Sequence, residues 1–77
     1  MAVGAFIFVE TAQGKSIGIC GEIKKIKGVK SAHAVTGPYD IIVLVEGDDV
    51  NMLGEFIVSQ IQGIPGVLRT MTNIIVE

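Results

Sequence analysis

One short pattern occurs twice in this chain, and this repeat constrains the fold more than any other feature. The pattern Ile-x-x-Ile-x-Gly-Val runs from Ile23 to Val29 and again from Ile61 to Val67, 38 residues later in a chain of 77. In each copy we interpret the isoleucines as the last core-facing residues of a helix and the glycine as the left-handed residue that ends the helix. A strand is expected after each valine. The chain is therefore expected to contain two copies of one β-α-β unit.

Strands are predicted before and after each helix from runs of β-branched and aromatic residues. The predicted strands cover residues 3–10, 31–36, 41–46 and 69–76. The cores of the first and third strands, AFIFV and IIVLV, are apolar on both faces, whereas SAHAVT and RTMTN carry the polar residues. This difference predicts that the first and third strands are central in the sheet and that the other two lie at its edges.

Two amphipathic helices are predicted between the strands. The first covers residues 15–27, with Ile19, Cys20, Ile23 and Ile26 at helical spacing on one face. The second begins after residues 47–49, where an aspartate is available as the N-cap and both aspartates lie near the positive end of the helix dipole. Its buried residues are expected to be Val50, Leu53, Ile57 and Ile61.

The order β-α-β-β-α-β with right-handed crossovers predicts an α+β, ferredoxin-like fold. In this fold a four-stranded antiparallel sheet carries two helices on one face. A chain of 77 residues has too little material to enclose a second core, so residues 1–77 are expected to form a single domain. No helix-turn-helix pattern is present, and no DNA-binding domain is expected within the chain.

The central strands are apolar on both faces, but helices can cover only one of them. The other face would be an apolar patch of the kind that soluble monomers avoid, so we expect it to pack against the same face of a second subunit. This sheet-to-sheet homodimer would be a dimeric α+β barrel. One cysteine, Cys20, and one histidine, His33, exclude an internal disulfide and a Cys/His zinc site within one chain. No cofactor or metal is expected, and self-association is the remaining source of extra stability.

Composition and charge exclude several classes of protein. Hydrophobic residues make up 49% of the chain, yet no uninterrupted apolar stretch approaches the roughly 20 residues that span a bilayer. The N-terminal segment lacks the basic region of a signal peptide, so a cytoplasmic location is expected. The net charge is −2, and no basic arm is present to neutralise phosphates. Direct binding of nucleic acid by this chain alone is not expected.

The turn at Gly37, Pro38, Tyr39 and Asp40 brings a glycine backbone, an aromatic ring and a carboxylate together. These residue types also form ordinary hairpin turns, in which Gly and Pro set the geometry and Asp accepts backbone hydrogen bonds. As a binding site, the same groups suit an α-amino acid. The carboxylate of Asp40 would pair with its ammonium, backbone N–H groups near Gly37 would receive its carboxylate, and Tyr39 would wall its side chain.

Two motifs resemble a known family. The segment 34–40, Ala-Val-Thr-Gly-Pro-Tyr-Asp, resembles the Val-Thr-Gly-x-Tyr-Asp signature of the Lrp/AsnC ligand-binding domain, and the segment 64–75 resembles the Pro-Gly-Val … Arg-Thr-x-Thr ending of that family. The resemblance covers nearly the whole chain. It implies amino-acid sensing by dimers that assemble into a ring and bind the effector between dimers. It further implies partnership with full-length Lrp/AsnC regulators through mixed oligomers.

By this resemblance the effector pocket would contain residues from two places in the chain. The loop of one subunit would contribute Thr36, Gly37, Pro38, Tyr39 and Asp40, and the last strand of a neighbour would contribute the residues Thr70 and Thr72. Pro38 stands at the variable position of the family signature and lacks an N–H, which removes one donor for the effector's carboxylate. The helix-turn-helix that normally precedes this domain in the family is also missing from the sequence.

Two other functions are compatible with the same fold. One is a small dimeric α+β barrel enzyme of the monooxygenase or isomerase type, with His33 as a base and a cavity between sheet and helices. His33 has no recognisable orienting partner in the sequence. The other is a purely structural assembly domain that binds nothing. Cys20 is interpreted as a small apolar core residue, Met52 and Met71 as packing residues, and the acidic group Glu46, Asp48 and Asp49 as a strand end followed by a helix cap.

Overall fold

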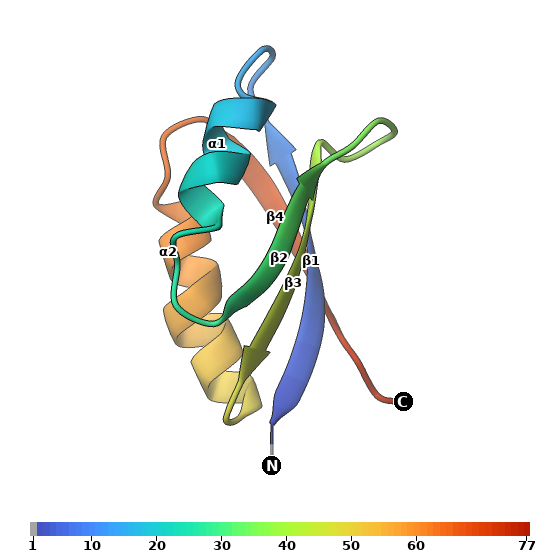
Figure 1. Ribbon diagram of the computed structural model, residues 1–77, viewed down its shortest axis with the longest axis vertical. Helices are drawn as coiled ribbons and strands as arrows, with labels where there is room; N and C mark the ends of the chain where they lie inside the picture. The colour runs from blue at the N-terminus through green and yellow to red at the C-terminus, as the bar shows by residue number, and fades with distance from the viewer. Residues whose placement is uncertain (1) are drawn as a thin grey trace.

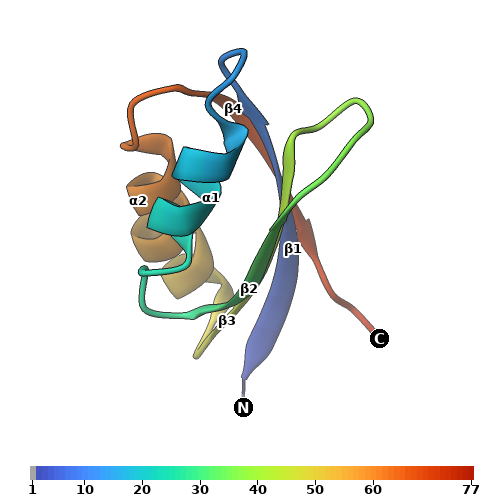
Figure 2. The same ribbon diagram turned by 45° about the horizontal axis from the view of Figure 1, so that its top comes forward.

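The computed structural model describes residues 2–77 and has two layers, a sheet and a pair of helices (Figure 1). The elements in chain order are β1 (Val3–Thr11), α1 (Ser16–Ile23), β2 (Val29–Ala34), β3 (Ile41–Gly47), the π-helical segment η1 (Met52–Val58), α2 (Ser59–Gln62) and β4 (Val67–Ile74). The helices all lie on one face of the sheet, and in Figure 2 no helix or strand covers the other face. The predicted ferredoxin-like fold is confirmed.

The four strands form one antiparallel sheet in the order β2-β3-β1-β4. The strands β1 and β3 are central, as their two-sided apolar sequences predicted. In the register, Ile7 lies opposite Val43 on one side and Thr72 on the other. The pairings of both edge strands carry a register shift, one between residues 29 and 31 of β2 and one between residues 10 and 11 of β1.

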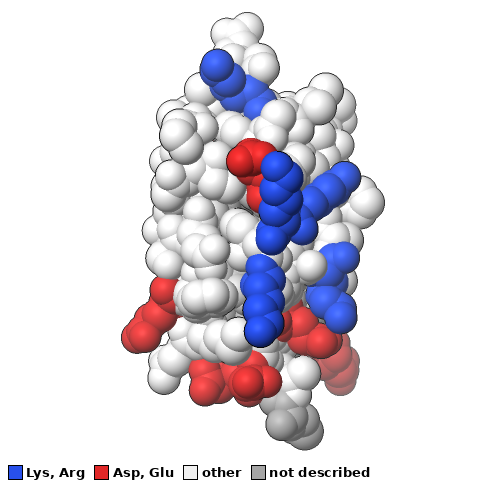
Figure 3. Space-filling view, turned by 60° about the vertical axis from the view of Figure 1, so that its left-hand side comes forward, with Lys and Arg blue, Asp and Glu red and all other residues white. Residues whose placement is uncertain are grey.

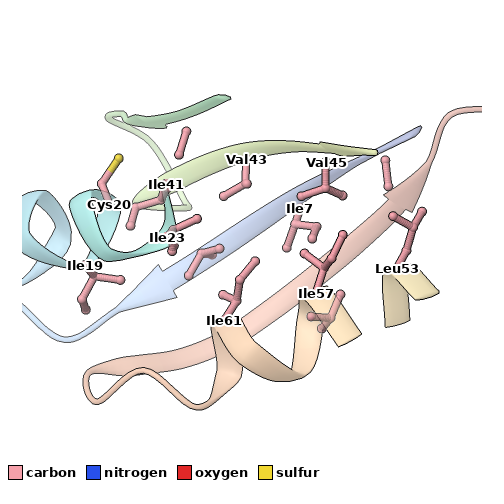
Figure 4. Packing of buried hydrophobic residues seen from close by; sticks show 14 residues of the cluster. Ile7, Ile19, Cys20, Ile23, Ile41, Val43, Val45, Leu53, Ile57 and Ile61 are labelled. Carbon is pink, nitrogen blue, oxygen red and sulfur yellow. The ribbon is translucent and has the colours of Figure 1, made fainter. Parts of the chain in front are cut away.

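The core lies between the sheet and the helices (Figure 4). Side chains alternate along a strand, so each central strand sends every second residue toward the helices. The residues Ala5, Ile7 and Val9 of β1 are fully buried, and so are Ile41, Val43 and Val45 of β3. They pack against the buried residues of the helices, namely Ile19, Cys20, Ile23, Leu53, Ile57, Val58 and Ile61. Cys20 is therefore a core residue, as the sequence indicated.

The helices differ in detail from the prediction. The first was predicted over residues 15–27, but α1 ends at Ile23. The second helical region begins at Val50, continues through η1 and ends with α2. Val50 was predicted in its buried stripe, but this prediction is wrong because the residue is 54% exposed in the first turn. The predicted aspartate cap is confirmed, since Oδ1 of Asp49 accepts a hydrogen bond of 2.8 Å from the backbone N–H of Met52.

The two repeated patterns form tight turns that follow the helices. Val29 N–H donates to the Ile26 carbonyl at 3.1 Å, and Val67 N–H donates to the Ile64 carbonyl at 3.2 Å. The glycines at positions 28 and 66 both have a φ of 100°, as the third residue of a type II turn requires. The predicted left-handed glycines are confirmed, but they belong to these turns, because the helices have already ended several residues earlier.

Each of these turns packs against the other half of the chain. A Cβ atom on Gly28 would lie 2.5 Å from Cδ1 of Ile57 in η1, and one on Gly66 would lie 2.9 Å from Cδ1 of Ile19 in α1. The turn after one helix therefore contacts the other helix in both halves. This reciprocal contact is the structural counterpart of the sequence repeat.

None of the helices described over residues 2–77 combines the length and the apolar character that crossing a membrane would require.

Candidate functional site

The loop between β2 and β3, residues 35–40, projects past the end of the sheet on the side away from the helices (Figure 2). The loop is closed at its base by a hydrogen bond of 2.8 Å from Val35 N–H to the Asp40 carbonyl. Gly37 has a φ of 119°, a conformation that side chains rarely adopt. Thr36, Gly37 and Pro38 are exposed at its tip. The predicted turn is thus present, with its polar backbone accessible.

Asp40 ties this loop to the central strand β1. Its Oδ2 atom accepts a hydrogen bond of 2.9 Å from the backbone N–H of Thr11, and its own N–H donates to the Val9 carbonyl at 3.0 Å. The interpretation of Asp40 as a turn residue that accepts a backbone bond is therefore confirmed. Within residues 2–77 no donor contacts its second carboxylate oxygen, Oδ1, and the residue is half-buried. The carboxylate is held in one orientation and can still accept another donor.

Tyr39 leaves the loop and lies across the uncovered face of the sheet. Its ring is tilted against that of Phe8, with the ring centroids 5.3 Å apart. Its hydroxyl donates to Sδ of Met71 in β4 at 3.6 Å, which links the loop to the far edge of the sheet. Within one chain the ring therefore covers strand residues, and it walls no pocket at the loop tip.

Thr70 and Thr72 lie on the helix-facing side of β4. They are opposite Val9 and Ile7, whose side chains point toward the helices, and Nε2 of Gln62 donates to Oγ1 of Thr70 at 2.9 Å. The strand β1 separates them from Asp40, so the two groups are about two strand spacings, roughly 10 Å, apart. One chain does not bring the loop and the threonines together. Their joining across two subunits stays a prediction.

The sheet face opposite the helices is called the open face here and consists mainly of apolar side chains. It carries the residues Phe6, Phe8, Tyr39, Ile42, Leu44 and Met71. Phe6 is 41% exposed and Met71 is 47% exposed, so a large apolar area faces solvent. Which residues of the central strands face this side could not be decided from the sequence alone. The structure assigns it because the helices cover the other set.

His33 belongs to the open face as well. It lies opposite Ile42 in the register, whereas its neighbours Ala32 and Ala34 lie opposite Val43 and Ile41 on the helix-facing side. The side chain of His33 therefore points away from the layer between sheet and helices, where the enzymatic alternative required a base. No group of three or more His, Cys, Asp or Glu residues that could hold a metal ion occurs within residues 2–77.

The described residues form two hollows at positions other than the loop 36–40. The larger lies between α1 and the edge strand β2, and is lined by residues Ile17, Cys20, Gly21, Lys24, Ala32, His33 and Ala34. A cavity between sheet and helices near His33 was expected only for the enzymatic alternative, and the residues that line this hollow were not predicted. The available signal was the set of small residues that α1 and β2 carry toward each other, Gly21, Ala32 and Ala34.

Comparison with known families and curated proteins gives the following likenesses. The family model described as Lrp/AsnC ligand binding domain matches residues 4–77. The HTH-type transcriptional regulator LysM of Saccharolobus solfataricus is 35% identical over 76 residues, which cover 97% of this chain and 53% of that regulator. Homocitrate synthase of Sulfurisphaera tokodaii is 38% identical over 52 residues, which cover 68% of this chain and 11% of that enzyme. The chain thus spans about half the length of the regulator.

Solved structures give the same picture. The protein TTHA0845 from Thermus thermophilus has a TM-score of 0.90 at 28% identity, and the match covers 97% of this chain and 94% of that one. The hypothetical protein PHS023 from Pyrococcus horikoshii has a TM-score of 0.87 at 37% identity, with 97% and 90% covered. The regulator NMB0573 from Neisseria meningitidis, solved as a complex with L-Met, has a TM-score of 0.84 at 21% identity, with 97% and 50% covered. This last likeness concerns the fold.

Proposed function

Because the chain belongs to the Lrp/AsnC ligand binding domain family, we propose that it senses a small amino acid and modulates transcription through regulators that contain the same domain. In this proposal the effector binds between dimers. The observation that carries the proposal is the state of the loop 36–40 in a single chain. The loop presents a free backbone and an oriented carboxylate at the molecular surface, and neither of the two hollows described above includes it. A second subunit is needed to complete such a site.

The first step of assembly in this proposal is a dimer formed by two open faces. Burying apolar area contributes about 25 cal/mol per Å², so covering side chains such as Phe6 and Met71 favours association. Tyr39 and Phe8 form an ordered aromatic pair on the same face and present a firm surface to a partner. The dimers would then associate further into a ring, in which the loop of one dimer meets the last strand of another.

Asp40 would bind the ammonium group of the effector. An ammonium removed from water requires an anionic or strongly polar partner, and Oδ1 of Asp40 has no donor within residues 2–77. The bond from Thr11 N–H fixes the carboxylate before the ligand arrives, so less side-chain entropy is lost on binding. Thr36 and the backbone around Gly37 are exposed beside it and would receive the effector's carboxylate.

Pro38 limits how this loop can bind a carboxylate. The residue has no backbone N–H, so the donors at the tip come from its neighbours Gly37 and Tyr39. The side-chain pocket would then be completed by Thr70 and Thr72 of a neighbouring subunit. An amino acid is a ligand class that the fold is able to hold, since a regulator of the same fold was solved as a complex with L-Met.

The likeness to a homocitrate synthase concerns only a short part of that enzyme. The similar segment makes up 11% of that enzyme and 68% of this chain. The chain resembles LysM, a transcriptional regulator, over 97% of its own length. The enzymatic alternative required a base directed between sheet and helices, whereas alternation along β2 turns the side chain of His33 to the open face.

The test is a thermal-shift screen of the twenty amino acids against the intact chain. A ligand present at 100 times its dissociation constant stabilises the native state by about 2.7 kcal/mol, which raises the melting temperature of a domain of this size by roughly 10 °C or more. We expect one amino acid or a small group of related ones to give this shift. If none of the twenty shifts the melting temperature, the chain is an assembly domain without this effector class.

A further inference from the structure

The hollow between α1 and β2 is a separate feature from the loop 36–40. It has a volume of about 420 Å³, within the range of about 300 to 1,000 Å³ that is usual for small-molecule sites. It exists because the facing side chains are small. A Cβ atom added to Gly21 would meet no atom within 4 Å, and Ala32 and Ala34 are the residues that β2 turns toward the helix. Ile17, which is 82% exposed, forms an apolar rim.

The free edge of the sheet brings unpaired backbone groups to this hollow. Val35 N–H donates to the Asp40 carbonyl, so the backbone groups of Val35 point inward across the β2–β3 boundary. In an antiparallel pair such inward groups alternate with outward ones. The backbone of His33 therefore faces β3, whereas the N–H groups of Ala32 and Ala34 point outward at the outer edge of β2, where no strand of residues 2–77 pairs with them.

Lys24 is the charged residue that lines the hollow. It is exposed at the end of α1, and within residues 2–77 no carboxylate forms an ion pair with it, whereas Lys25 is bound to Glu22 at 2.9 Å and Lys30 to Glu46 at 3.9 Å. Figure 3 shows Lys and Arg side chains gathered along one stripe of the surface, with an acidic group among them and further acidic side chains near the lower end. No acidic residue lines the hollow itself.

We infer that this hollow binds a small aliphatic carboxylate without an ammonium group. Its carboxylate binds between Nζ of Lys24 and the outward N–H groups of Ala32 and Ala34, and its hydrocarbon part fills the space beside Gly21 and Ile17. This second ligand class does not depend on the amino acid effector proposed above. It gives the domain a site within one subunit in addition to a site between subunits.

The lining favours such a ligand over two alternatives. An α-amino acid would place its ammonium where no lining residue offers a carboxylate, and that group would lose water without a partner. An extended peptide could add to the edge of β2, but the strand is six residues long and offers only the outward N–H groups of its two alanines at the hollow. A compact ligand uses both groups together with Lys24.

The test compares two molecules that share one carbon skeleton, isocaproate and L-leucine, which differ in the α-ammonium group. The chain is labelled with nitrogen-15 alanine, so that the described alanines Ala2, Ala5, Ala12, Ala32 and Ala34 give separate backbone amide signals. Isocaproate is expected to shift the signals of Ala32 and Ala34 in a saturable way. L-leucine is expected to leave these two signals in place, whatever it does elsewhere.

Two matched pairs of variants locate the site. Lys24→Gln is expected to weaken isocaproate binding about three- to tenfold, while Lys25→Gln, one residue further along, leaves it unchanged. Gly21→Leu fills the hollow and is expected to abolish the shifts. Gly18→Leu, on the same helix and outside the hollow, preserves them. Both substitutions are compatible with the fold, because the added Cβ at either glycine meets no atom within 4 Å.

Several results would overturn the inference. Absence of shifts at Ala32 and Ala34 with isocaproate at about 10 mM would show that the hollow binds no ligand of this class. A dissociation constant well above this concentration is too weak to indicate a specific site. Equal shifts with the neutral amide of isocaproate would remove the role of Lys24. Equal weakening in Lys24→Gln and Lys25→Gln would replace a site by diffuse charge attraction. None of these results bears on the amino acid effector, whose readout is the thermal-shift screen and the Asp40 variant.

Discussion

Asp40 serves the fold and the proposed site with different atoms of one carboxylate. Oδ2 accepts the bond from Thr11 N–H and holds the loop against β1, whereas Oδ1 is left for a ligand. A structural role and a binding role are therefore separable by experiment. An asparagine keeps the shape and one acceptor oxygen, but it removes the negative charge.

Asp40→Asn is predicted to weaken binding of the effector identified by the thermal-shift screen. Loss of one charge-assisted hydrogen bond costs about 1.5–3 kcal/mol, or roughly a ten- to hundredfold loss in affinity. Calorimetric titration measures this change, and melting of the unliganded variant is measured alongside it. Asp48→Asn is the matched control, since Asp48 is exposed and lies outside the loop. Unchanged affinity in Asp40→Asn would show that the ammonium contact is wrong.

Gly28→Ala is predicted to destabilise the chain by more than about 1 kcal/mol. The residue has a φ of 100°, and its new Cβ would lie 2.5 Å from Cδ1 of Ile57 in the core. The control is Gly18→Ala in α1, where the Cβ meets no atom within 4 Å and alanine is the better helix former by about 0.5–1 kcal/mol. In urea unfolding, the free energy of unfolding should fall for Gly28→Ala and rise for Gly18→Ala, relative to the parent chain. If Gly28→Ala is as stable as the parent chain, the turn can move to accommodate the new Cβ atom without cost.

At the scale of the elements, the start of the second helical region depends on one side chain. Asp49 accepts the Met52 N–H and so satisfies one of the free donors of the first turn. The neighbouring Asp48 has the same charge and also lies near the helix start, yet within residues 2–77 it caps no backbone N–H. Substitutions at these two aspartates can therefore distinguish the contribution of the hydrogen bond from the contribution of negative charge near the helix N-terminus.

Asp49→Ala is predicted to lower the free energy of unfolding by about 1 kcal/mol, the usual cost of losing an N-cap. Asp48→Ala is predicted to cost less, because it removes charge near the helix N-terminus without removing the hydrogen bond. Thermal unfolding of both variants in the same buffer gives the comparison. Equal losses in the free energy of unfolding would show that the hydrogen bond from the Met52 N–H adds no stability beyond the effect of the charge.

At the scale of the whole molecule, the open face of the sheet is the surface on which the proposed oligomeric state depends. Phe6 and Ile7 are neighbours in β1 but point to opposite faces, with Phe6 on the open face and Ile7 fully buried under the helices. The same chemical change at these two positions therefore tests the interface and the core separately.

Phe6→Asp is predicted to convert the assembled chain to folded subunits of lower mass, because it places a charge in the proposed interface. Ile7→Asp is predicted to unfold the subunit, because it buries an unpaired charge in the core. Light scattering gives the mass and circular dichroism gives the fold. A parent chain that is a stable monomer at micromolar concentration would contradict the proposed dimer.

Much of the fold could be predicted because the relevant signals are local. Alternation in β1 and β3, helical spacing of Ile19 and Ile23, and the repeated glycine turns each depend on a few consecutive residues. The predictions were wrong where tertiary packing, and not the local residue pattern, decides whether a side chain is buried. Val50 fits a helical stripe, but in the first turn of the helix the packed core does not reach the residue and leaves it exposed.

The candidate site was predicted only as a set of residues. The loop residues from Thr36 to Asp40 could be identified from the family motif and lie together as expected, but Tyr39 folds onto Phe8 and Met71 instead of standing at the tip. These contacts join residues 31 to 32 positions apart, and no local pattern encodes them.

The order of the elements, the central and edge strands, the left-handed glycines and the family could all be predicted from the residues. These follow from residue periodicity and backbone preference, which act over short stretches of chain. Three features emerged only in the folded chain: the covered face of β1 and β3, the anchoring of Asp40 by Thr11, and the hollow that small residues leave beside Lys24. Both faces of a central strand are equally apolar in the sequence, and the side on which the helices pack is fixed only by the handed path of the chain across the sheet.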